Sequence, residues 1–127
     1  MLRRTLLCLG CLLLVLPRAF AERPPESQDD ATHVVVGEVE AVYVLEDRSN
    51  RNYVVKIVVE KLERGTGFEE GDAFFAECFQ RRRDAPRIPA AYGHRAVPQA
   101  GQRIRAFVIR GGPRSEGIYP DWFQVLK

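Results

Sequence analysis

Cysteine is scarce in this sequence, and histidine is scarcer. The 127 residues include three cysteines and two histidines. Because Cys8 and Cys11 lie close to the N-terminus, a chain processed after Ala21 keeps only Cys78 and forms no internal disulfide. One cysteine and two histidines give no metal-ligand pattern, so we predict neither a metal site nor a cofactor. Cys78 is expected to be a small buried hydrophobe, with a reactive thiol or an intermolecular bridge as the alternatives.

No apolar run is long enough to span a bilayer, which takes about 20 residues. The longest run, residues 6–16, follows two arginines and precedes the small-residue site Ala-Phe-Ala at residues 19–21. This order is typical of a signal peptide. We therefore expect residues 1–21 to be cleaved near Ala21, leaving a secreted or periplasmic protein without a stable membrane anchor. A lipid anchor at Cys11 is the alternative.

The sequence also lacks a sustained helical period. Val, Ile and aromatic residues gather in short segments between turn residues, which is typical of strands. The predicted strands cover residues 33–45, 53–62, 73–79, 102–110 and 122–126. Because Gly37 predicts a bulge or bend in the first strand, the pattern favours an all-β, small, five-stranded, partly open OB-like barrel over a two-sheet β-sandwich. Residues 33–127 then form one domain, after a flexible leader at residues 22–32.

Alternation within the predicted strands assigns their faces. In the first strand the odd positions, which include Tyr43 and Leu45, form the more apolar face. In the third strand Cys78 shares a face with two apolar residues. The glycines and proline of residues 111–117 predict a turn.

Catalytic groups are few and widely spaced. His94 is the only histidine in a predicted loop, and Ser115 is the only serine in the C-terminal half. A general base needs an orienting partner and a nucleophile within reach, and no such set occurs at motif spacing. We therefore expect a non-catalytic binding module, with a small enzyme that uses His94 as an alternative.

Charge is divided unevenly along the chain. Residues 22–80 hold 14 acidic and 6 basic residues, whereas residues 81–127 hold 3 acidic and 10 basic residues. Arginine binds phosphate, sulfate and carboxylate groups in a bidentate manner, and aromatic rings stack on bases or sugars. The candidate binding residues lie in the long loop 80–101 and the fourth strand: Arg81, Arg82, Arg83, Arg87, Tyr92, Arg95, Arg103 and Arg105.

Two interpretations of this division remain open. The arginines bind an anionic polymer or an acidic protein surface, or they neutralise the acidic half of the same barrel or of a second copy. Self-association is compatible with both interpretations.

The first two strands also resemble a known family. Ala31, the run Val34-Val-Val-Gly37 and the segment 59–65, which ends Glu-Arg-Gly, are similar to netrin-like modules, the group that includes tissue inhibitors of metalloproteinases. The resemblance covers residues 31–79 and implies an OB-type barrel and, as an alternative function, a protease-inhibitor-type module. Inhibitors of this group chelate the protease zinc through a cysteine at the mature N-terminus, and this chain has no cysteine near the N-terminus expected after cleavage at Ala21. The layout is also similar to that of short secreted bacterial β proteins.

Overall fold

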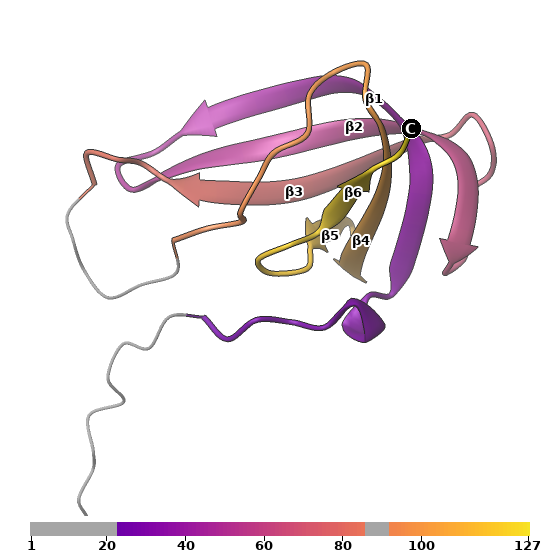
Figure 1. Cartoon of the computed structure of the whole chain (residues 1–127), viewed down its shortest axis with the longest axis horizontal. Coiled ribbons are helices and arrows are strands. Elements are labelled where there is room, and N and C mark those ends of the chain that lie inside the picture. The colour runs from indigo at the N-terminus through magenta and orange to yellow at the C-terminus, as the bar shows by residue number, and fades with distance from the viewer. Residues whose placement is uncertain (1–22, 86–91) are drawn as a thin grey trace, which may run out of the picture.

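A long twisted hairpin forms the frame of the protein. In the computed structural model, which describes residues 23–85 and 92–127, β1 (His33–Glu46) and β2 (Asn50–Arg64) pair antiparallel over most of their length (Figure 1). Asp47 organises the turn, because its carboxylate accepts hydrogen bonds from the amides of Asn50 at 2.7 Å and Ser49 at 2.8 Å. These bonds hold the pKa of Asp47 below its usual value.

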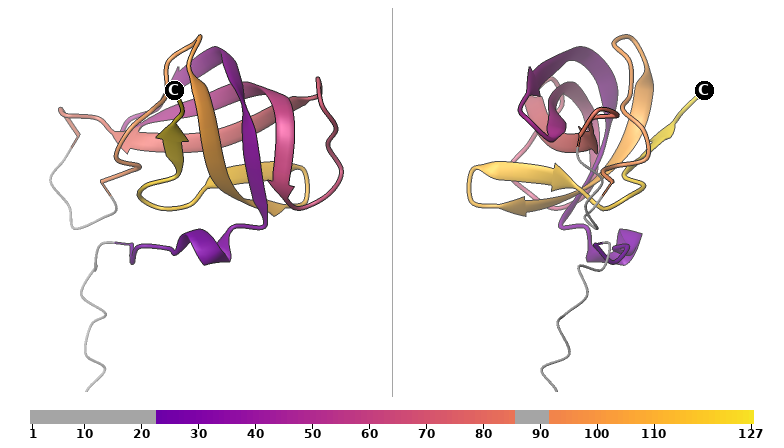
Figure 2. Two further views of the ribbon diagram at one scale, coloured as in Figure 1. Left: turned by 45° about the vertical axis from the view of Figure 1, so that its right-hand side comes forward. Right: turned by 90° about the vertical axis from the view of Figure 1, so that its left-hand side faces the viewer.

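The remaining strands close this frame into a barrel. β3 (Ala73–Arg81) pairs with β2, β5 (Arg114–Gly117) lies between β3 and β4 (Arg103–Gly111), and β4 returns to pair with β1. All of these pairings are antiparallel except that of β3 with β5. The all-β prediction of a small five-stranded barrel is therefore confirmed (Figures 1 and 2).

Three details differ from the sequence prediction. The barrel is closed and carries one extra strand, whereas a partly open barrel was expected. Residues 114–117 were assigned to a turn, but they form β5, because only the Gly-Gly-Pro part at 111–113 makes the reversal. The predicted fifth strand is the extra one, β6 (Phe123–Val125), which pairs with β4 outside the closed set.

Gly37 allows β1 to pair with two neighbouring strands. Residues His33 to Glu38 pair with β4 on one edge and with β2 on the other, and the β2 register shifts between Val36 and Gly37. A Cβ at Gly37 would lie 2.1 Å from the carbonyl oxygen of Val58, a distance that forbids any side chain. The unpaired extra residue at this shift is Glu60, so the bulge lies in β2, opposite Gly37, and not in β1 itself as predicted; the glycine lets β2 approach closely.

The core combines inward residues of β1, β2, β3 and β4 with Trp122. The fully buried side chains include Val35, Val39, Val55, Ile57, Phe74, Ile104, Val108 and Trp122. The face assigned to the end of β1 was wrong: Tyr43 and Leu45 are exposed, and Val42 packs against the core instead. The cause is the third register shift, between Val39 and Ala41, where the extra residue Glu40 lies in β1 and reverses the alternation.

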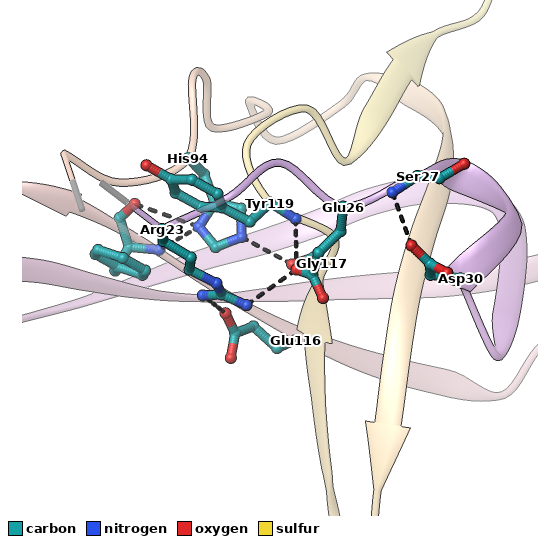
Figure 3. A network of polar contacts seen from close by, with 9 residues as sticks. Arg23, Glu26, Ser27, Asp30, His94, Glu116, Gly117 and Tyr119 are labelled. Carbon is teal, nitrogen blue, oxygen red and sulfur yellow. Dashed lines mark hydrogen bonds and ion pairs between the residues drawn. The ribbon is translucent and has the colours of Figure 1, made fainter. Parts of the chain in front are cut away.

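The segment before β1 makes defined contacts, although its composition predicted a loose leader. The amide of Glu26 donates to the carbonyl of Tyr119 at 2.6 Å, and the guanidinium of Arg23 donates to Glu116 at 2.6 Å (Figure 3). Ser27 caps the 3-10 helix η1 (Gln28–Asp30), which leads into β1. Within the described residues, no helix is long and apolar enough to cross a membrane.

We expect Gly37→Ala to lower the free energy of unfolding by about 2 kcal/mol, because the added methyl group overlaps the β2 backbone. Gly111→Ala is the matched control, since Gly111 also lies in a strand but its Cβ would meet nothing within 4 Å. Urea unfolding of both variants measures the difference. Equal midpoints for the two variants would show that β1 does not depend on this close approach.

Cys78 is 3% exposed, and burial raises the pKa of its thiol to about 12. At pH 8 only about one thiol in ten thousand is then ionised. In a chain with Cys8→Ser and Cys11→Ser, we expect a thiol reagent to label Cys78 slowly until the protein is unfolded. The same chain with Leu45→Cys, at a well-exposed site, supplies the fast-labelling control. Rapid labelling of native Cys78 contradicts the buried, unreactive thiol.

Candidate functional site

A hollow of about 440 Å³ lies where β3 ends and the following segment returns beside it. The amide of Arg81 donates to the carbonyl of Tyr92 at 3.0 Å, and the amide of His94 donates to the carbonyl of Phe79 at 2.7 Å. Gly93 makes this approach possible, because a Cβ there would lie 2.5 Å from the Phe79 carbonyl oxygen. The residues that line the hollow are Gln80, Arg81, Arg83, Tyr92, Gly93, His94, Arg95, Tyr119 and Pro120.

Three arginines give this hollow its charge, and none of the described residues that line it is acidic. Arg83 is exposed and forms no ion pair with any residue in the described ranges. Arg95 pairs with Asp121 at 3.2 Å, but both side chains are well exposed, so the pair is weak. The ring of Tyr92 is 67% exposed at the same rim. We call this cavity the arginine hollow, and its candidate binding residues are Arg81, Arg83, Tyr92 and Arg95.

Arg82 points to a second, adjoining hollow of about 420 Å³, and its side chain is already engaged. Its guanidinium donates to both carboxylate oxygens of Asp84, at 2.8 and 3.0 Å, and to the carbonyl of Asp47 at 3.1 Å. These bonds lower the pKa of the Asp84 carboxyl. Arg82 therefore fastens the end of β3 to the hairpin turn.

Arg103 and Arg105 lie elsewhere on the barrel. Arg103 donates to Glu60 at 2.8 Å, and Arg105 forms a short hydrogen bond with Glu63, which lowers the pKa of that carboxyl. Arg81 is opposite Asn50, ten residues before Glu60, so about 30 Å of β2 separates the two places. The predicted single patch is thus two patches. Arg87 lies outside the described residues.

His94 is held by the backbone on both sides of its ring (Figure 3). It is 2% exposed; Nε2 lies 2.8 Å from the carbonyl oxygen of Gly117, and Nδ1 accepts from the amide of Phe79 at 3.1 Å. Nδ1 also lies 3.4 Å from the carbonyl oxygen of Phe79, so both ring nitrogens face backbone groups. These contacts leave neither nitrogen for a substrate proton, so His94 positions the segment beside β3.

Several lining residues of the arginine hollow escaped the sequence analysis. Tyr119 and Pro120 come from the segment after β5, and Gly93 supplies a close backbone approach. The Tyr-Gly-His run at residues 92–94 was the available signal, because a glycine between two large polar rings suggests a constrained turn. Among the described residues, no three His, Cys, Asp or Glu side chains are grouped so that they could hold a metal ion.

Comparison with known proteins supplies no relative from which a role could be transferred. No protein-family model, no curated protein and no solved structure matches the chain. The resemblance to netrin-like modules therefore stays a prediction, carried by residues 31–79.

Proposed function

We propose that the protein is an exported, non-catalytic binding module that takes an anionic group in the arginine hollow. The observation that carries this proposal is the lining itself: three arginines surround about 440 Å³, with no acidic side chain among the described lining residues. Guanidinium groups that lie close together repel each other, and a bound anion offsets that repulsion.

The chemistry of the lining favours a phosphate, sulfate or carboxylate group. A guanidinium offers a planar pair of donors to two oxygens of such a group, which an ammonium does not. Tyr92 adds an exposed aromatic face on which a base or sugar ring can stack. The partner is accordingly an anionic polymer or an acidic protein surface.

Internal charge compensation accounts for arginines outside the hollow. Arg103, Arg105 and Arg114 bond Glu60, Glu63 and Glu77, respectively. These pairs join β2 or β3 to β4 or β5 and need no external ligand. The proposed site is therefore narrower than the whole basic half of the chain.

We expect the full chain to be retained on immobilised heparin at low salt and to lose retention when Arg83 and Arg95 are changed to Gln. Each lost phosphate-like or sulfate-like contact lowers the slope of log affinity against log salt by about one unit. Arg103→Gln with Arg105→Gln is the matched control, because it removes the same charge from the other patch. Circular dichroism checks that both double variants are folded.

Equal loss of retention in the two double variants would mean that net charge alone binds heparin. If the unmodified chain is not retained at all, the result favours the alternative in which the arginines only neutralise the acidic half of the barrel. Tyr92→Ala distinguishes ligand classes: a stacked ligand predicts weaker binding to single-stranded DNA with unchanged heparin retention.

A further inference from the structure

One edge of the hairpin has no neighbour. Residues His33 to Glu38 of β1 pair with β4, and Val39 exchanges backbone hydrogen bonds with Gly101 and Gln102. Beyond the register shift after Val39, the described residues provide no strand beside β1 on the side opposite β2. In Figure 1 this end of the hairpin extends to the left, away from β4 and β6. We call residues 41–46 the free edge.

The free edge is apolar on both of its faces. Tyr43 is 54% exposed, Val44 53% and Leu45 75%, although alternate residues of a strand point to opposite faces. The core therefore covers neither Tyr43 and Leu45 on one face nor Val44 on the other, although Val42 still packs against it. Residues 41–45 read Ala-Val-Tyr-Val-Leu, without the proline, lysine or inward charge that usually protects an exposed edge. Unpaired backbone groups beside exposed β-branched and aromatic side chains form a template for another strand.

We propose that this edge pairs with the free edge of a second copy of the chain, antiparallel and about a two-fold axis at Val44. A two-fold axis perpendicular to the sheet keeps the side chains of paired residues on the same face. Because alternate residues point to opposite faces, the numbers of two paired residues must both be odd or both be even, so their sum is even. Pairing Val44 with Val44 of the second copy places Tyr43 opposite Leu45 of that copy, and Leu45 opposite its Tyr43. Two aromatic–aliphatic cross-strand pairs then cover the most exposed side chains of the edge.

Charge complementarity favours a second copy over an unrelated strand. The carboxylates that flank the edge are already neutralised within the hairpin: Glu40 pairs with Lys56 at 3.0 Å, and Glu46 with Arg51 at 2.7 Å. In the proposed register, Ala41 lies opposite Asp47 of the second copy. Glu46 lies opposite Val42 of the second copy in the same register, so no two like charges face each other across the pairing.

A pairing of seven residues per copy, 41–47, is short, so the dimer is expected to be weak and concentration-dependent. Sedimentation velocity of the full chain over a concentration series should show a rising weight-average coefficient. Leu45→Lys puts a charge into both cross-strand pairs and should weaken association at least about tenfold. Phe75→Lys is the matched control, because Phe75 is an exposed aromatic residue on β3, two strands from the edge. Every variant carries the same residues 1–22, so their contribution cancels.

Cysteine cross-linking tests the register. In a chain with Cys8→Ser and Cys11→Ser, Val44→Cys should form a disulfide-linked dimer under mild oxidation, because facing Cα atoms of an antiparallel pair lie about 5 Å apart. Leu45→Cys should not, because residue 45 of one copy lies two residues away from the position opposite residue 45 of the other. The two Cα atoms are then about 8 Å apart, too far for a disulfide. A monomer at every concentration, or association that Leu45→Lys leaves unchanged, overturns the proposal. Cross-linking through Leu45→Cys but not Val44→Cys overturns the register.

Discussion

The close approach of β2 to β1 at Gly37 is the contact on which the barrel depends. A side chain at this position would overlap the carbonyl of Val58, so glycine alone lets β2 follow the bend. The bend turns the first half of β1 toward β4 and leaves its second half with β2 only. β1 stays paired with β4 as far as Glu38, and the free edge begins after the separate register shift between Val39 and Ala41.

Much of the architecture could be predicted because local pattern and global fold agree. Runs rich in Val, Ile and Phe marked β1 to β4. β5 could not be found this way, because its four residues include Ser115, Glu116 and Gly117 and have no apolar alternation. The face of Tyr43 was wrong for a similar reason: a one-residue bulge reverses alternation without any sequence marker.

The charges of the candidate site could also be predicted only in part. The sequence identified the arginines, but it could not divide them, because the division depends on which carboxylates lie across the barrel. Glu60 and Glu63, more than 40 residues before Arg103 and Arg105, neutralise them. Arg83 has no such partner in the described ranges. The uneven charge of the two halves is thus partly an internal balance between strands and partly a surplus at the end of β3.

The arginine hollow and the free edge belong to the same end of the molecule. Arg82 joins them, since its amide donates to the carbonyl of Ser49 and its guanidinium to that of Asp47, in the hairpin turn. In the proposed dimer, β1, β2 and β3 of both copies form one sheet, and the two-fold axis puts both hollows on the same side of it. With strands about 4.8 Å apart, the hollows lie roughly 30 to 40 Å from each other. If both proposals hold, a polymer long enough to span that distance reaches the second hollow at high effective concentration, so the proposed dimer and the proposed anion site would strengthen each other.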